Sequence, residues 1–203
     1  MSKLVLICAR NRLPVDADGL RQLSRRLAPD NIVPREPKIL QQGNVLIGIF
    51  NPTDTVAVEG LSVCLGRMCG DGGGGWLPDS ENPDGTYALF RVDDEHVELV
   101  SDMVGSRTIW YVHTGDLFVA ATSQRAIVSV LKGFSFNEQV VPWILSSGTL
   151  GPDHSWDKRI KCLAGNSRLL LNRETWQTKL AWAHVRYAPE NRSAAEFGDE
   201  LGS

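Results

Sequence analysis

Four short apolar segments follow one another in the middle of the chain, and the gaps between them are too short to hold a helix. They occupy residues 86–92, 97–102, 108–113 and 117–121. Polar residues at 93–95 and 114–116 are typical of hairpin connections. Because parallel strands require crossover connections of a dozen or more residues, this spacing predicts an antiparallel meander.

Further strands are predicted on both sides of this meander. They cover residues 4–9, 44–50, 61–68, 167–171 and 176–183. The first is a continuous apolar run, which is typical of a strand buried on both faces. So many apolar strands in one chain predict an α+β fold in which helices cover two sheets.

Three helices are predicted. Residues 16–28 place apolar side chains at helical spacing, and Pro29 ends this helix. Ser123 and Asn137 are predicted N-caps of helices at 123–131 and 137–145. Within the last of these, Pro142 is expected to distort the later part, and the helix should stop before Gly148.

Two segments have a loop-like composition. Residues 70–85 contain four consecutive glycines and two prolines, which predicts a flexible loop. From residue 188 onward the chain becomes polar. We therefore expect one domain at residues 1–187, followed at 188–203 by a linker or by the start of another domain.

Composition excludes several classes of protein. The formal net charge is −3 and no basic face is apparent, so no binding to nucleic acid is expected. No apolar run of about 18 residues exists, so neither a membrane span nor a membrane partner is expected. The four cysteines form neither a disulfide framework nor a zinc-like spacing, which indicates reduced thiols, no metal site and a cytoplasmic location.

Five segments carry more specific information. In chain order they read DGTYALF (84–90), SDMVGSRTIWY (101–111), GDLFVAATSQRAI (115–127), VPWILSSG (141–148) and WDKRIKCLAG (156–165). In composition and order they resemble motifs of the N-terminal domain of asparagine synthetases, a class II glutamine amidotransferase domain. The resemblance spans residues 84–182 and is carried by structural positions. Gly105 is suited to a tight turn, and Asp102 is suited to cap that turn with its side chain.

The resemblance implies an N-terminal-nucleophile hydrolase fold, a four-layer αββα sandwich of two mainly antiparallel sheets. In the family, a cysteine exposed by removal of the initiator methionine attacks glutamine. The corresponding position here is Ser2, which is therefore a candidate catalytic residue. Cys8 lies inside the first predicted strand and is expected to be a buried apolar cysteine.

Other parts of the family's site have no counterpart. The strand that carries the glutamine-binding arginine corresponds to residues 45–51, which contain no arginine. In the turn that supplies oxyanion-hole donors, Gly66 is retained as a candidate substrate-binding residue, but Leu65 replaces an asparagine. Asp71 and Asp79 lie near the position of the family's acid, but nothing assigns that role to either. We therefore expect that glutamine hydrolysis has been lost.

The implied parent protein is an ATP-dependent amide-forming ligase of the asparagine-synthetase type. This segment would serve as a scaffold for a C-terminal synthetase domain or a separate synthetase subunit, and a homodimer is a further option. No S-G-G-x-D-S pyrophosphate loop occurs in the sequence, so ATP and Mg²⁺ are expected to bind the synthetase domain and no cofactor is expected here. The late tryptophans 143, 156, 176 and 182 suit core packing or an interdomain contact.

Three alternatives remain open from the sequence. The first is an active glutaminase that uses Ser2 as its N-terminal nucleophile. The second is a stand-alone binding or regulatory protein. The third is a natural-product synthetase that forms an amide or lactam from an amine within its own substrate.

Overall fold

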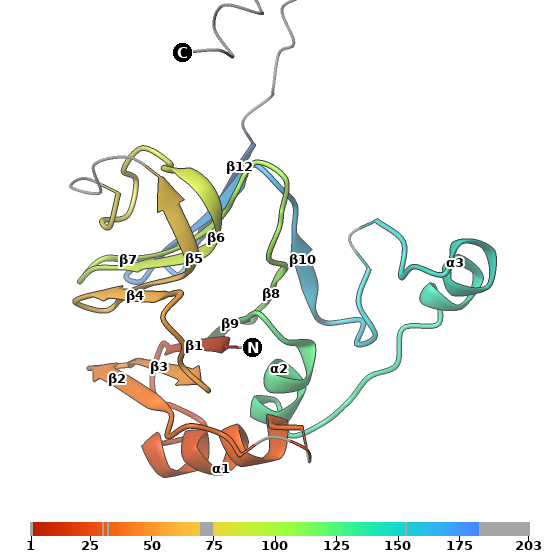
Figure 1. The fold of residues 1–203 in the computed structure, drawn as a ribbon, viewed down its shortest axis with the longest axis horizontal. Coiled ribbons are helices and arrows are strands. Elements are labelled where there is room, and N and C mark those ends of the chain that lie inside the picture. The colour runs from red at the N-terminus through yellow and green to blue at the C-terminus, as the bar shows by residue number, and fades with distance from the viewer. Residues whose placement is uncertain (1, 30, 32, 70–74, 153, 183–203) are drawn as a thin grey trace, which may run out of the picture.

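The computed structural model describes residues 2–182 apart from 30, 32, 70–74 and 153. The chain forms an α+β fold in which two six-stranded antiparallel sheets face each other (Figure 1). In spatial order, the first sheet contains β10 (Lys161–Leu163), β8 (Ile109–His113), β9 (Leu117–Ala121), β1 (Lys3–Ala9), β3 (Val45–Phe50) and β2 (Lys38–Gln42). The second contains β12 (Thr178–Trp182), β11 (Ser167–Asn172), β7 (His96–Ser101), β6 (Asp84–Val92), β5 (Ser62–Cys69) and β4 (Val56–Glu59). The predicted α+β class and the predicted antiparallel strands are confirmed.

The four central strands do not form one meander, contrary to the expectation from their spacing. Strands β6 and β7 pair in the second sheet, whereas β8 and β9 pair in the first. The chain crosses from one sheet to the other between Ser101 and Ile109. This crossing segment contains Asp102 and Gly105, so the motif that carries the family resemblance is also the connection between the sheets.

The main core lies between the two sheets. Leu4, Leu6 and Cys8 of β1 belong to it, whereas Val5 and Ile7 belong to a second core on the opposite face of the same strand. This alternation follows from the two-residue period of a strand. The prediction that residues 4–9 are buried on both faces is confirmed.

Helices α1 (Ala17–Leu27) and α2 (Gln124–Val130) cover the outer face of the first sheet (Figure 1). Asp16 caps α1, because its side chain accepts a hydrogen bond of 2.8 Å from the Gly19 amide. Ser123 occupies the predicted N-cap of α2, but its hydroxyl makes no capping hydrogen bond. The buried residues Ala126 and Ile127 anchor this short helix to the sheet.

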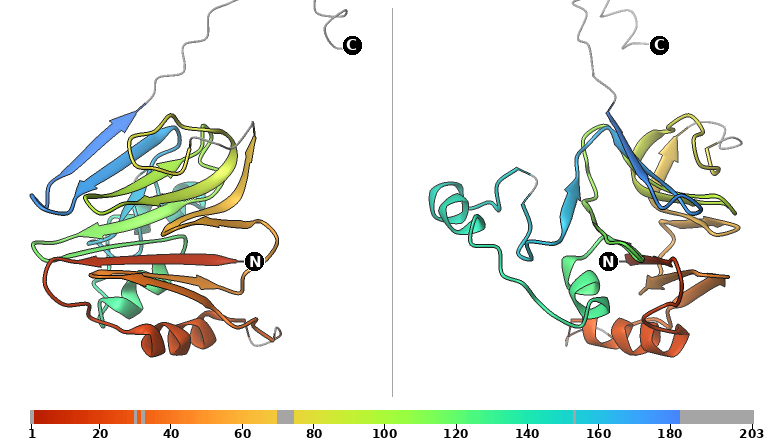
Figure 2. Two further views of the ribbon diagram at one scale, coloured as in Figure 1. Left: turned by 90° about the vertical axis from the view of Figure 1, so that its left-hand side faces the viewer. Right: turned by 180° about the vertical axis from the view of Figure 1, so that it is seen from behind.

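Helix α3 (Val140–Ser147) stands away from both sheets (Figure 2). It ends at Gly148, which adopts the left-handed conformation with φ 70°, as predicted. The helix begins later than predicted, so its N-cap is Gln139 and not Asn137. The Asn137 side chain still accepts a 3.2 Å hydrogen bond from the Gln139 amide and donates one of 3.0 Å to the Ser155 carbonyl. This later start also places Pro142 in the first turn, where a proline is tolerated, so the predicted distortion does not arise.

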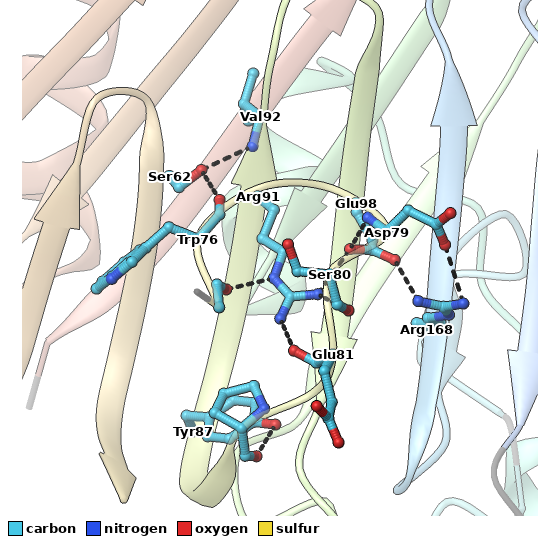
Figure 3. Close-up of polar contacts among 12 residues, drawn as sticks. Ser62, Trp76, Asp79, Ser80, Glu81, Tyr87, Arg91, Val92, Glu98 and Arg168 are labelled. Carbon is cyan, nitrogen blue, oxygen red and sulfur yellow. Dashed lines mark hydrogen bonds and ion pairs between the residues drawn. The ribbon is translucent and has the colours of Figure 1, made fainter. Parts of the chain in front are cut away.

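The outer face of the second sheet is covered by an extended segment, residues 75–83, which we call the strap (Figure 3). The described residues contain no helix on this face, so they form one helical layer rather than the two of a four-layer sandwich. The loop predicted at 70–85 therefore has two described parts. Residues 75–83 form the strap and residues 84–85 begin β6, whereas residues 70–74 lie outside the described residues.

The strap is held by the fully buried side chain of Arg91 on β6 (Figure 3). Its guanidinium donates hydrogen bonds of 2.7–3.1 Å to the backbone carbonyls of Gly75, Ser80 and Glu81. It also forms a 3.0 Å ion pair with Glu98 on β7, which is equally buried. Because the strap carbonyls and the carboxylate together compensate the buried guanidinium, this segment is ordered rather than flexible.

The predicted boundary between residues 187 and 188 lies outside the described residues, so it remains a prediction. Within residues 2–182 with their gaps, no helix is long and apolar enough to cross a membrane.

Candidate functional site

Ser2 lies directly before β1, and its side chain is enclosed. The residue is 5% exposed, and its hydroxyl donates a 2.9 Å hydrogen bond to the Asn51 carbonyl. The Thr53 hydroxyl lies 2.8 Å from the Ser2 hydroxyl. Because Ser2 has one hydroxyl proton and gives it to Asn51, Thr53 is the donor in this second bond.

Thr53 and Thr55 join the two predicted site residues, Ser2 and Gly66, through hydrogen bonds. The Thr53 hydroxyl lies 3.0 Å from that of Thr55, and the Thr55 carbonyl accepts a 2.8 Å hydrogen bond from the Gly66 amide. The structure therefore brings Ser2 and Gly66 into one network. The two threonines that connect them were missed in the sequence, where residues 51–54 have the composition of an ordinary linker.

Gly66 is required by the backbone geometry at this point of β5. Its φ is +134°, and a Cβ at this position would lie 2.1 Å from the Thr86 carbonyl oxygen on β6. Gly85 on β6 has the same property, with φ +139° and a Cβ position 2.2 Å from the Arg67 carbonyl oxygen. Paired glycines thus allow the two strands to approach where side chains would prevent it.

The groups that a glutaminase needs are not assembled around Ser2. In the described part of the chain, the hydrogen-bond partners of its side chain are Asn51 and Thr53, with no carboxylate or cation among them. Leu65, at the position of the family's asparagine, is buried in the main core. Asp79 lies on the strap and pairs with Arg168 at 3.0 Å on the outer face of the second sheet. Asp71 lies outside the described residues.

Cys8 offers no substitute nucleophile. Its side chain is fully buried in the main core, as expected. Burial raises the pKa of the Cys8 thiol to about 11, although Arg173 opposes this shift. Since the thiolate is the nucleophilic form, Cys8 is unreactive at neutral pH.

Asp102 organises the turn that links the sheets, as the sequence predicts. Its Oδ1 accepts 3.0 Å hydrogen bonds from the amides of Val104 and Ser106, and its Oδ2 accepts from the Tyr87 amide at 2.8 Å and from the Ser106 hydroxyl. Burial opposes ionisation of this carboxyl, but these hydrogen bonds outweigh burial and lower its pKa. Gly105 adopts φ +64°, so the predicted tight turn at this glycine is also confirmed.

An apolar surface lies on residues 134–157, apart from 153, which we call the aromatic arm. It includes α3, and its exposed large side chains are Phe134, Phe136, Val141, Trp143, Leu145 and Trp156. Phe136 lies between Phe134 and Trp156, with ring centroids 6.3 and 6.4 Å apart. Leu145, at 82% exposed, extends the surface onto α3. Large apolar side chains exposed together on one segment are typical of a protein–protein contact.

Charged and polar groups at its base fix the position of the aromatic arm. The buried carboxylate of Asp157 accepts hydrogen bonds from the Ser135 amide at 2.9 Å and from the Arg159 guanidinium at 2.6 and 2.9 Å. The bonds from Arg159 are the main reason that the pKa of Asp157 is lowered to about 2. These hydrogen bonds therefore hold the ends of the backbone segment that bears the exposed aromatic rings.

Core packing is confirmed for one of the late tryptophans, and the interdomain contact stays a prediction for the others. Trp176 is buried in the main core, and its indole donates a 2.8 Å hydrogen bond to the Thr114 carbonyl. Trp143, Trp156 and Trp182 are exposed. Within the described residues, no group of three or more His, Cys, Asp or Glu side chains is placed to hold a metal ion. A scan of protein-family models finds none that matches the chain, and a search of curated proteins finds no significant match.

Proposed function

We propose that this chain is a degenerate glutaminase-like domain of an asparagine-synthetase-like protein, with an N-terminal-nucleophile fold of which the described residues form both sheets and one of the two helical layers. In this role the domain does not hydrolyse glutamine. It serves as a scaffold for a synthetase partner that forms an amide with ATP and Mg²⁺. The nitrogen then comes from ammonia or from an amine of the substrate.

One observation carries the proposal. The two positions that correspond to the family's nucleophile and oxyanion donor are both engaged in internal hydrogen bonds. The Ser2 hydroxyl donates to Asn51 and the Gly66 amide donates to Thr55. An N-terminal nucleophile gives its proton to its own α-amine, and an oxyanion hole needs a free donor. Here the Ser2 hydroxyl gives its proton to the Asn51 carbonyl and the Gly66 amide is occupied by the Thr55 carbonyl, so the site is suited to closing the end of β1 rather than to catalysis.

The packing of the family-like segments supports the proposed fold. The segments 101–111 and 156–165 are far apart in sequence, yet Gly105 of the first contacts Gly165 of the second. In addition, the Asn166 amide donates a 2.7 Å hydrogen bond to the Asp102 carbonyl. These contacts explain why glycines recur in both motifs of the resemblance.

The aromatic arm supports a docking role. Helix α3, with the sequence VVPWILSS, carries no charged residue, and the stacked rings of Phe136 and Trp156 belong to the same arm. Exposed aromatic and aliphatic side chains of this kind suit the centre of a stable protein–protein interface. We assign this surface to the contact with the synthetase partner.

The test begins with the native polypeptide purified from its source, whose intact mass and reading frame past Ser203 are determined together with any subunit that copurifies. The proposal predicts an S-G-G-x-D-S loop either downstream in the same chain or in a copurifying subunit. Leu145→Glu on the aromatic arm should then weaken the contact between domain and partner, whereas Val33→Glu, at another exposed apolar position, should not. A native chain that ends near Ser203 and copurifies with no ATP-binding subunit would contradict the proposal and favour a stand-alone binding protein.

A further inference from the structure

A small apolar hollow lies between the end of α1 and the start of β1. Its volume is about 140 Å³, and its apolar walls are Leu27, Ala28, Pro29, Pro34 and Phe50. Three polar side chains also line it, those of Lys3, Ser24 and Asn51. A concave apolar site with a few converging polar groups is the usual form of a small-ligand pocket.

The hollow lies on the other face of β1 from the Ser2 site and shares one residue with it, Asn51, whose carbonyl accepts from Ser2. Side chains alternate along β1, so Leu4 and Leu6 face the core between the sheets, whereas Val5 and Ile7 face the helices. Lys3 is on the helix side with Val5, and its ammonium donates a 2.9 Å hydrogen bond to the Leu27 carbonyl at the end of α1. Binding of a ligand in the hollow would therefore not depend on glutamine hydrolysis or on a synthetase partner.

Among the residues that the structure describes, the Lys3 ammonium has no ion-pair partner, and one of its three N–H groups is used by Leu27. Burial, together with the charge of Arg125, lowers the pKa of Lys3. Arg25 and Arg26 in the last turn of α1 add further positive charge nearby. The hollow thus offers a cationic group that an anion would stabilise.

Ser24 provides a second unused polar group. The residue is 3% exposed, and its hydroxyl has no hydrogen-bond partner among residues 2–182 as described. The oxygen is not sealed inside the protein, so a ligand in the hollow can reach it. The Ser24 hydroxyl and the Lys3 ammonium both line the same hollow, and both can donate to one acceptor.

We propose that this hollow binds a small apolar carboxylate. The carboxylate would accept hydrogen bonds from Lys3 and Ser24, and the apolar part would lie against Leu27, Pro34 and Phe50. The size of the ligand follows from the volume, because an engineered protein cavity of about 150 Å³ holds a benzene molecule. A benzoate-sized acid is therefore the largest ligand that we expect to fit.

The test is a titration of the 203-residue chain with benzoate, monitored by amide chemical shifts in ¹H–¹⁵N NMR spectra. We expect saturable shifts confined to the residues around the hollow. Lys3→Met should weaken binding by about 10- to 100-fold, the range expected for a hydrogen bond to a charged group. The matched control Lys38→Met, an exposed lysine on β2, should leave binding unchanged.

Two further measurements keep the proposal falsifiable if Lys3→Met does not fold. Ala28→Leu fills the hollow without changing its charge and should abolish binding. Benzyl alcohol, which has the ring but no carboxylate, should bind at least about tenfold more weakly than benzoate. Equal binding of both probes, binding retained by Ala28→Leu, or shifts that never saturate would each overturn the proposal.

Discussion

Gly105 and Gly165 lie backbone against backbone. A Cβ built on Gly165 would lie 2.9 Å from the Gly105 amide nitrogen, and one built on Gly105 would lie 3.3 Å from the Gly165 Cα. This contact joins the turn that crosses between the sheets to the segment between β10 and β11. Its tightness explains why neither position accommodates a side chain.

Gly165→Ala should therefore destabilise the protein. The added methyl group meets backbone atoms, which cannot rotate away as a side chain can, so we expect a loss of about 1–3 kcal/mol in the free energy of unfolding. Urea unfolding measures this loss. Gly115→Ala is the matched control, because a Cβ at Gly115 has no atom within 4 Å. Equal effects of the two substitutions would contradict the close approach at Gly165.

Arg91→Met tests the attachment of the strap. The substitution removes the 3.0 Å ion pair of the buried Glu98 carboxylate and leaves it only the Asp79 amide at 3.1 Å and Arg168 at 3.7 Å, which should lower the free energy of unfolding by about 3–5 kcal/mol. It also releases the carbonyls of Gly75, Ser80 and Glu81, so limited proteolysis should cut within residues 75–83 faster than in the unmodified chain.

The control for Arg91 is Arg21→Met. Arg21 is partly exposed and pairs with Asp18, whose side chain is 79% exposed, so its loss should cost less than about 1 kcal/mol. A strap that remains resistant to proteases in Arg91→Met would show that the apolar contacts of Trp76 and Leu77, rather than Arg91, hold it.

The sequence predicted the strands better than their assignment to sheets. Apolar runs such as 4–9 and 45–50 specify buried strands, and turn residues specify hairpins. Sequence spacing does not reveal that β6–β7 and β8–β9 lie in different sheets, because this depends on the turn that Asp102 holds through Tyr87 on a neighbouring strand. Strands β2 and β4 were missed because they are short edge strands with partly exposed side chains.

Of the candidate site, the sequence identified Ser2 and Gly66 but not what surrounds them. Thr53 and Thr55 act through a hydroxyl and a carbonyl that meet Ser2 and Gly66 only in the folded chain. Arg91 likewise gave no signal, because an arginine in an apolar strand is commonly assumed to be at an edge. Its burial depends on the strap, which lies within the stretch 70–85 that the sequence predicts to be a flexible loop.

Thiol reactivity should separate the cysteines. Burial raises the pKa of Cys8 and of Cys64 to about 11, so both carry almost no thiolate at pH 7. Cys69 is exposed and should react first with a disulfide reagent such as dithionitrobenzoate. Peptide mapping of the modified protein should locate the first label on Cys69, and label on Cys8 or Cys64 should require denaturant. Rapid labelling of Cys8 in the folded protein would contradict the burial of β1.

The free energy of unfolding should depend on pH through Asp157 at the base of the aromatic arm. Its pKa is lowered from 3.8 to about 2, chiefly by Arg159, so its stabilising effect is complete above about pH 4 and is lost as pH falls towards 2. Asp157→Asn should reduce stability at pH 7, and the difference from the unmodified chain should shrink between pH 4 and pH 2. Urea unfolding at pH 7, 4 and 2 provides the comparison. Asp54→Asn, at an exposed carboxylate, should show no such difference.

The most direct test of the central claim is to incubate the purified chain with a glutamine-directed diazo-ketone and to record its intact mass, alongside ammonia release from glutamine. Because the Ser2 hydroxyl and the Gly66 amide are engaged in internal hydrogen bonds, we predict an unchanged mass and no ammonia above the background without protein. A single adduct on Ser2 that disappears in Ser2→Ala, together with ammonia release, would contradict the account and establish an active glutaminase.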